Sequence, residues 1–322
     1  MIPKFTYARA TSVQQAVKQS SALGTMLHAG GTDLLGCLRD RVVSIDKAVS
    51  ISGISELRGI KSTKEGGLSI GALMTLAEVA DHPLIAERYA ALAQGAASAA
   101  SPQLRNQGTL GGNLCQRPRC WYFRGQFHCL RKGGDRCYAV AGRNEFHAIL
   151  GGEGCYIVHP SDTAPGLMAL EALVRVVGPR GARTIPLNSF FVGPDKEKMK
   201  ENVLTQGDVI TEILLPPRGA GHRSSYRKVR ARGAWDFALA GVALSIRFAE
   251  NRVAEARIVL SGVAPVPWRS AEAEKVLIGQ QMDQGVAQRA AEACVKDAVP
   301  LSGNEYKIHL TRGLVHDALL AL

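Results

Sequence analysis

The chain of 322 residues is longer than the ~100–200 residues of one average domain, so we expect two units, each with a substantial core. Its 46% hydrophobic and 21% charged residues exclude a disordered or low-complexity chain. The formal net charge of +11 is compatible with binding to nucleic acid, a membrane surface, an anionic cofactor or an acidic partner. Basic residues peak at 117–132 and 222–232 without the stripe of a DNA-reading helix, which favours a cofactor or partner protein over nucleic acid.

Hydrophobic periodicity predicts alternating short strands and helices up to the Pro- and Gly-rich linker at 216–221. Ser12 has a side chain suited to cap the first helix, and Pro102 ends the alanine-rich one. Strands are expected at 5–7, 25–28, 48–51, 68–71, 157–159, 173–177 and 209–215, and helices at 12–23, 76–81, 84–100 and 163–173. Beyond the linker we expect strands at 224–229, 237–248 and 253–261 and helices at 271–279, 284–295 and 311–322. The pattern predicts a C-terminal α+β domain.

No run of ~18 apolar residues is present, so no membrane span is expected. The first residues also lack the apolar core of a secretory signal. Export would therefore require a partner that carries its own signal.

Two glycine turns are candidates for holding a ligand. The first follows a strand and opens a helix, and the second lies downstream in 106–114. Glycines let backbone amides approach an anion, and a helix N-terminus favours negative charge. Either turn alone could be purely structural, but together they could hold one dinucleotide from two sides. Neither matches the G-x-G-x-x-G fingerprint, so a Rossmann fold is disfavoured.

Five of the seven cysteines lie within 41 residues, in a segment without helix or strand periodicity. Their spacing is Cys115-x4-Cys120-x8-Cys129-x7-Cys137-x17-Cys155, which matches neither zinc knuckles nor the compact ferredoxin run. Clustering without a signal peptide favours metal ligation over disulfides. The spacing leaves an iron–sulfur cluster, zinc and free thiols open.

Several stretches, in this order, resemble the FAD-binding subunit of the xanthine dehydrogenase and carbon monoxide dehydrogenase family. They are residues 29–35, 51–60, 70–76, 105–114 and 159–164, then 226–230, 262–269 and 306–308. The resemblance implies an α+β fold: a two-subdomain FAD-binding unit of the vanillyl-alcohol-oxidase (PCMH) type at 1–218, followed by a carbon monoxide dehydrogenase flavoprotein C-terminal-like domain at 219–322. The subdomains would span about 1–56 and 57–218, with the cysteine-rich insertion at 115–155.

The resemblance also implies the cofactor site and no catalytic residue on this chain. Ser161 and Asp162 would reach the ribitol or ribose, although they could simply cap a helix. Lys228 would lie near the flavin ring, with a solvent-facing or subunit-contact role as the alternative. The pyrophosphate would bind to Ala29, Gly30, Gly31, Thr32, Asp33 and Leu34 and to Gly108, Thr109, Gly111, Gly112 and Asn113.

The insertion resembles those of two branches, the 4-hydroxybenzoyl-CoA reductase flavin subunit and the periplasmic aldehyde oxidoreductases, which are associated with a [4Fe–4S] cluster. The matching stretches are 119–120, 129–137 and 155. The ligands implied are Cys120, Cys129, Cys137 and Cys155, whereas Cys115 belongs to the flavin turn.

We therefore expect an FAD- and [4Fe–4S]-carrying electron-transfer subunit of a bacterial, soluble molybdenum hydroxylase that oxidises aldehydes. Partners would be a large molybdopterin-binding subunit and a small [2Fe–2S] subunit, with an external electron acceptor and no nucleic acid. The complex would be periplasmic if exported with a signal-bearing partner, and cytoplasmic otherwise. Alternatives are the flavin subunit of a xanthine dehydrogenase-like or 4-hydroxybenzoyl-CoA reductase-like complex, and a stand-alone FAD oxidase.

Overall fold

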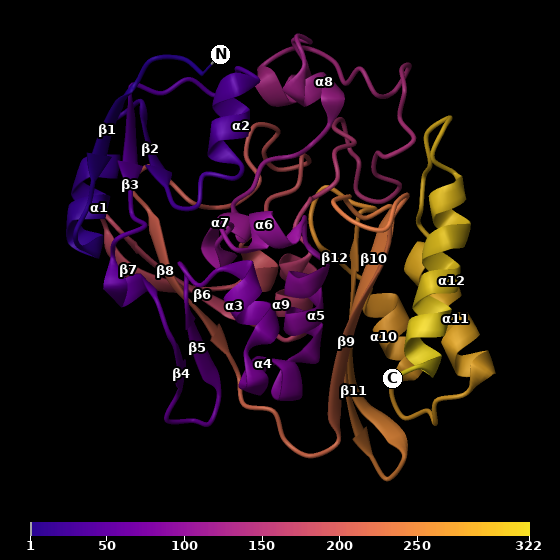
Figure 1. Ribbon diagram of the computed structural model, residues 1–322. Coiled ribbons are helices and arrows are strands. Elements are labelled where there is room, and N and C mark those ends of the chain that lie inside the picture. Colours follow the sequence, from indigo (N-terminus) through magenta and orange to yellow (C-terminus); the bar gives the residue numbers. More distant parts are fainter. Residues whose placement is uncertain (1) are drawn as a thin grey trace.

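The computed structural model describes residues 2–322 and contains three β-sheets with helices packed on and between them (Figure 1). The first sheet is parallel, with strand order β1-β3-β2. The side chain of Ser12 caps the first helix by accepting a hydrogen bond from the amide of Gln15, as its residue type predicts. The elements of this layer are β1 (Thr6–Arg9), α1 (Val13–Ser20), β2 (Thr25–His28), α2 (Leu34–Arg39) and β3 (Lys47–Ser50).

The second sheet is antiparallel and has the order β4-β5-β8-β6-β7. Its strands are β4 (Ile60–Ser62), β5 (Leu68–Gly71), β6 (Leu173–Gly178), β7 (Gly181–Pro186) and β8 (Val209–Leu215). Apolar side chains of β5, β6 and β8 form one core with the neighbouring helices. These helices are α3 (Leu76–Asp81), α4 (Pro83–Arg88), α5 (Ala90–Ser98), α6 (Pro102–Arg105), α7 (Leu110–Leu114) and α9 (Thr163–Ala169).

The third sheet is antiparallel in the order β12-β11-β10-β9. Helices α10–α12 cover one face and form a second large core with it (Figure 1). The opposite face contacts α5 and α9, so these two helices lie between the second and third sheets. The elements are β9 (His222–Val229), β10 (Ala240–Ala249), β11 (Arg252–Ser261), β12 (Trp268–Arg269), α10 (Ala271–Leu277), α11 (Gln284–Val295) and α12 (Tyr306–Leu320).

Several sequence-based expectations differ from the structure. The helix expected at 163–173 ends at Ala169, the strand expected at 237–248 begins at Ala240, and strands β4 and β7 are additional. The helix expected at 84–100 is two helices, α4 and α5, which meet at Tyr89, whose hydroxyl donates to the carbonyl of Pro216 at 2.8 Å. No strand forms at 157–159, where the His159 amide donates to Ala264 O but no ladder develops. The last helix begins at Tyr306, five residues before the expected start at Thr311.

The cysteine-rich insertion runs above the other layers as a long irregular path (Figure 1). Its regular structure is α8 (Trp121–Arg124) and one 3-10 turn (Leu130–Lys132). The end of the insertion is fixed to the C-terminal part of the chain, where the buried Lys307 ammonium donates to the carbonyls of Phe146 and Gly262 at 3.0 and 2.7 Å. Within residues 2–322, no helix combines the length and the apolar character that crossing a membrane requires.

Candidate functional site

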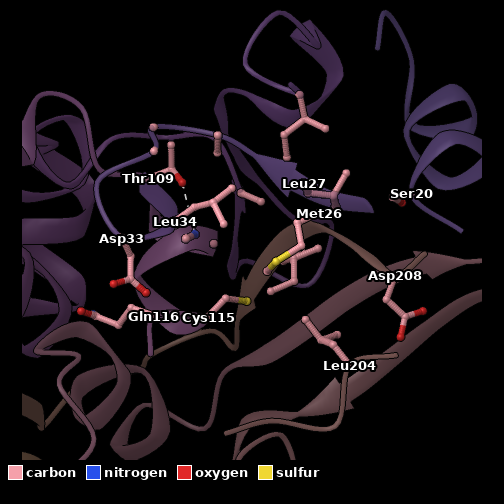
Figure 2. A pocket seen from close by; sticks show the side chains of 18 of the residues that line it. Ser20, Met26, Leu27, Asp33, Leu34, Thr109, Cys115, Gln116, Leu204 and Asp208 are labelled. Atoms are coloured by element: carbon pink, nitrogen blue, oxygen red, sulfur yellow. Dashed lines mark hydrogen bonds between the residues drawn. The ribbon is translucent and has the colours of Figure 1, made fainter. Parts of the chain in front are cut away.

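The main candidate ligand site is a large cavity of about 580 Å³ that both glycine turns border. Figure 2 shows it extending from Thr109, Asp33 and Gln116 at one end towards Ser20 and Asp208 at the other. Met26, Leu27, Val43 and Leu204 give the far part an apolar wall. The cavity is therefore elongated, with a polar glycine-lined end.

The first glycine turn presents a row of amides that no protein group uses. Among residues 2–322, no backbone or side-chain acceptor takes the amide hydrogens of residues 30–34. All five residues border the cavity, and Gly31 has φ +72°, a conformation that only glycine adopts without strain. Successive free amides at a helix start form a concave binding site for an anion such as pyrophosphate.

The second glycine turn is the start of helix α7, and most of its amides are already bonded. Leu110 and Gly111 donate to the carbonyls of Met74 and Ala72, and Gly112 donates to the Thr109 hydroxyl. Gly30 packs against this segment so closely that a Cβ there would lie 1.9 Å from the carbonyl oxygen of Gln107. The second turn therefore forms a wall of the cavity and supports the first turn.

Asp33 lies in the first turn but directs its carboxylate towards the insertion. Its oxygens accept from the Arg117 amide at 2.7 Å and from the guanidinium groups of Arg124 at 2.8 Å and Arg119 at 3.1 Å. Arg117 in turn forms a two-point ion pair with Glu201, at 3.0 Å for both contacts. The ligand turn and the insertion are thus joined by charged hydrogen bonds.

Asn113 and Ser161 lie together, although 48 residues separate them. The Asn113 side-chain oxygen accepts from the hydroxyls of Ser161 at 2.5 Å and Thr163 at 2.6 Å. The Ser161 hydroxyl also accepts from the amide of Ala164, so it caps α9. Of the two residues predicted as possible caps, Ser161 makes the cap hydrogen bond, whereas the side chain of Asp162, at the N-cap position, makes none. Ser161 also lines a cavity of about 140 Å³, where a ligand could contact it.

Asp162 forms a buried ion pair with Lys228 at 2.7 Å, and their side chains are only 6% and 3% exposed. The same carboxylate accepts from the Tyr226 hydroxyl at 2.8 Å, and Lys228 also donates to Ser98 O at 3.2 Å. Burial raises the pKa of Asp162, while Lys228 acts in the opposite direction. Because Lys228 lies on β9 and Asp162 precedes α9, this pair joins the two halves of the chain; Lys228 is not solvent-facing.

Two smaller cavities continue the first one towards the cysteine residues. A cavity of about 290 Å³ shares Thr32, Asp33 and Thr109 with the large cavity. A third, of about 140 Å³, shares Arg119 and Asp162 with the second. Two aromatic side chains of the loop between β9 and β10, Trp235 and Phe237, line the second cavity. Their place there was not expected from the sequence.

Four cysteine side chains border one small void of about 10 Å³, from four positions of the insertion. They are Cys120, Cys129, Cys137 and Cys155. All seven cysteines of the chain are free thiols. Cys115 lies outside this group and borders the large cavity instead. The structure therefore brings together the four predicted residues and separates the fifth.

Two buried histidines lie near this group. The Cys120 sulfur is 3.3 Å from Nε2 of His147, and His159 borders the third cavity. Burial lowers the pKa of His147 to about 4 and that of His159 to about 3. Both imidazoles are therefore neutral at pH 7. Within residues 2–322, no three His, Cys, Asp or Glu side chains converge closely enough for a single metal ion.

Sequence reasoning did not identify Gln116 or Tyr226 as parts of the site, and it placed Arg119 only beside the cysteine residues. Arg119 borders both smaller cavities, and Gln116 borders the large one. Tyr226 holds Asp162 from β9. An arginine next to a cysteine ligand candidate was visible in the sequence, but its partner Asp33 is 86 positions away and only the fold shows the contact.

The chain is similar to known proteins over its whole length. A family described as the FAD binding domain in molybdopterin dehydrogenase matches residues 3–218, and the CO dehydrogenase flavoprotein C-terminal domain matches residues 224–322. The aldehyde oxidoreductase FAD-binding subunit PaoB of Escherichia coli is 36% identical, with 96% of this chain and 95% of that protein covered. The carbon monoxide dehydrogenase medium chain of Hydrogenophaga pseudoflava is 30% identical, covering 99% and 97%.

Solved structures agree with these relatives. Carbon monoxide dehydrogenase from Hydrogenophaga pseudoflava, in a form lacking the Mo-pyranopterin moiety of its cofactor, superposes with a TM-score of 0.79 at 28% identity. That match covers 100% of this chain and 98% of the other. The predicted α+β fold, with an FAD-binding unit followed by a flavoprotein C-terminal domain, is confirmed. The chain belongs to the FAD-binding medium subunits of the xanthine dehydrogenase and carbon monoxide dehydrogenase family, and is thus a subunit of an oxidoreductase.

Proposed function

We propose that this chain holds FAD along the connected cavities, with the pyrophosphate on the free amides of residues 30–34. That row of amides, bordering a cavity of about 580 Å³, is the observation that carries the proposal. The second turn, at Gly108, Thr109, Gly111, Gly112 and Asn113, supports the first and lines the cavity. Ser161 and Asp162 border the adjoining cavity, and Lys228 acts by fixing Asp162.

We further propose two units, at 1–218 and 219–322, with subdomains at about 1–56 and 57–218. The strands of the three sheets fall at 6–50, 60–215 and 222–269, which supports these limits. Residues of the two proposed subdomains line the large cavity, and residues of all three parts line the second cavity. The Asp162–Lys228 pair would keep the parts in register when the cofactor is bound.

A second redox centre on this chain is proposed at Cys120, Cys129, Cys137 and Cys155. A tetrahedral zinc ion needs thiolate sulfurs within about 4 Å of one another, an arrangement that residues 2–322 do not offer. A [4Fe–4S] cluster attaches each sulfur to a different iron, which suits four thiols spaced around a common void. The void of 10 Å³ is about one water in size, so the ring of thiols has to open when a cluster is inserted.

The chain would act as the electron-transfer subunit of a heteromeric molybdenum hydroxylase. When bound, FAD accepts two electrons and releases them singly or in pairs. We propose a small partner with [2Fe–2S] clusters as the donor, a large partner with the molybdenum cofactor as the site of substrate oxidation, and an external acceptor. The residues of this chain hold the cofactor, exclude water from it and link its turn to the insertion.

Aldehydes are the proposed substrates of the complex, because PaoB is described as an aldehyde oxidoreductase subunit. A xanthine dehydrogenase-like or 4-hydroxybenzoyl-CoA reductase-like complex is the alternative. A stand-alone oxidase is the third candidate. Export together with a signal-bearing partner would place the complex in the periplasm; otherwise it is cytoplasmic.

The test is an anaerobic absorption spectrum of the purified chain, with flavin, iron and sulfide analysis. We expect one FAD and about four iron atoms per chain. Cys137→Ser should lose the iron and keep the flavin, whereas the matched control Cys294→Ser, at a buried cysteine in α11, should keep both. Flavin without iron in the wild-type chain would remove the cluster from the proposal, and bound zinc without flavin would refute it entirely.

A further inference from the structure

Arg119 lies at the junction of the ligand turn, the insertion and the C-terminal part of the chain. Its guanidinium pairs with Asp33 at 3.1 Å, donates to Gln116 Oε1 at 3.2 Å and to the carbonyl of Arg117, and lies 5.2 Å from the ring centre of Phe237. It borders both smaller cavities and immediately precedes Cys120. Four groups therefore fix one guanidinium at the wall of a cavity.

The charge of Arg119 is only partly neutralised. Asp33, its one ion-pair partner among residues 2–322, is shared with Arg124, which lies closer at 2.8 Å. Asp40 lies 3.7 Å from Arg124 but has a closer cation of its own, Arg39, at 3.1 Å. The other carboxylates bordering the second cavity have cations of their own: Asp162 pairs with Lys228 at 2.7 Å, and Asp236 lies 3.9 Å from Arg232. A net positive potential therefore remains at this end of the site.

The second cavity is the place for an electron-carrying ring. The first cavity beyond the glycine turn is walled by aliphatic side chains, whereas the second has Trp235 and Phe237. The second cavity also adjoins the third, which Cys120 borders. A planar ring there would lie between the amides of the first turn and the cysteine residues. Electron transfer through this chain requires the ring to lie on the side of the first turn that faces the cysteine residues. This step rests on the proposed function.

We propose that Arg119 sets the redox preference of the flavin by placing a positive charge beside its ring. Full reduction adds two electrons, from the partner subunit, and one proton, from solvent, so the reduced ring carries one negative charge. A nearby cation stabilises that form relative to the neutral oxidised ring. Asp33 tunes this effect in the opposite direction, since its carboxylate offsets part of the guanidinium charge.

The test measures the flavin midpoint potential of the full chain in its purified complex, by anaerobic titration against an indicator dye. At a fixed ambient potential, Arg119→Gln should raise the ratio of oxidised to reduced flavin at least tenfold, which is about 30 mV for a two-electron couple. Arg119→Lys should restore most of the change. Asp33→Asn should shift the ratio in the opposite direction, because it leaves the guanidinium charge uncompensated.

The control is Arg143→Gln. Arg143 belongs to the same insertion and lies 5.4 Å from the ring centre of Trp121, but its side chain is 79% exposed. We expect no change in potential there. A purely structural role of Arg119 would lower the melting temperature without moving the potential, and the opposite signs at Arg119 and Asp33 would not appear.

Three outcomes overturn the proposal. One is an Arg119→Gln complex that retains flavin at the wild-type potential. Another is weakened FAD binding with an unchanged potential in the bound fraction, which would make Arg119 a pyrophosphate anchor. If Arg119→Gln fails to fold, an unchanged potential in Asp33→Asn decides against the proposal. A wild-type chain without flavin would instead refute the proposed function itself.

Discussion

The buried pair of Asp162 and Lys228 provides a quantitative test of how the two halves of the chain are held together. Lys228→Met removes the cation and leaves the carboxylate with only the Tyr226 hydroxyl as a donor. Asp162→Asn leaves the ammonium with the carbonyl of Ser98. Breaking a buried pair in this way costs about 3–5 kcal/mol per single substitution. That is a large share of the ~5–15 kcal/mol that stabilises a typical domain.

The double variant should lose much less than the sum of the two single variants. With both charges gone, no unpaired ion stays buried, and the Tyr226 hydroxyl can still donate to the asparagine oxygen. We expect a coupling energy of at least about 2 kcal/mol, measured by urea unfolding at 25 °C and pH 7.5 with circular dichroism. Additive losses would refute the view that the pair acts as one buried unit.

The pH dependence of Lys228→Met gives an independent check. Burial raises the pKa of Asp162 even with the lysine present, and removing the cation raises it further. A carboxyl with a raised folded-state pKa favours the folded state at low pH and loses that contribution as the pH rises through its folded pKa. The deficit of Lys228→Met relative to wild type should therefore shrink from pH 8 to pH 5. A deficit that is constant over this range would show that the carboxylate is not desolvated.

Two further predictions concern the ligand turn and a buried histidine. Gly30→Ala places a Cβ 1.9 Å from Gln107 O, so it should separate the glycine turns and weaken FAD binding at least tenfold, as measured by fluorescence titration. The control Gly53→Ala, whose Cβ would have no atom within 4 Å, should bind FAD normally. Equal affinities of the two variants would refute the close approach of the turns. The lowered pKa of His159, about 3, keeps it neutral when folded while the unfolded chain is protonated below about pH 6.5. Its contribution to stability is complete above that pH and falls by about 1.4 kcal/mol per pH unit below it. His159→Gln should therefore flatten the loss of stability between pH 6 and pH 5, and an unchanged slope would contradict burial of the neutral ring.

Local sequence patterns predicted several elements to the residue. The strands at Thr25–His28, Leu68–Gly71 and Val209–Leu215 and the helix at Gln284–Val295 have the expected limits, and α3 begins at the expected residue, Leu76. Local residues mark such limits. At the start of α3, for example, the side chains of Thr75 and Glu78 form a capping box, in which each accepts a hydrogen bond from the backbone amide of the other. In these cases, local propensity and burial favour the same limits.

Long-range contacts account for the elements that the sequence could not predict. The apolar pattern of 84–100 continues through Tyr89, but the hydroxyl of Tyr89 binds Pro216, and the helix is interrupted there. Ile157 and Val158 have strand-like side chains, yet they form no ladder within residues 2–322, and the flanking Tyr156 and His159 bond to Ala148 and Ala264. Neither outcome can be derived from a window of adjacent residues.

The candidate site likewise has features that the sequence could predict and features that only the fold shows. Glycines and hydroxyls marked both turns in the sequence, but which turn has free amides depends on the distant carbonyls of Ala72 and Met74. The basic residues at 117–132 suggested a cofactor or partner protein. Their pairing with Asp33 in the ligand turn follows only from the fold.

The most direct test of the account compares the isolated chain with the assembled complex. The flavin-loaded chain is mixed anaerobically with an aldehyde in a stopped-flow instrument, and the flavin absorbance is followed, first alone and then with both partner subunits. The account predicts that the flavin of the isolated chain stays oxidised and that the flavin in the complex is reduced within the time of a single turnover. Reduction of the isolated chain by the aldehyde would contradict the role of an electron-transfer subunit and favour a stand-alone oxidase.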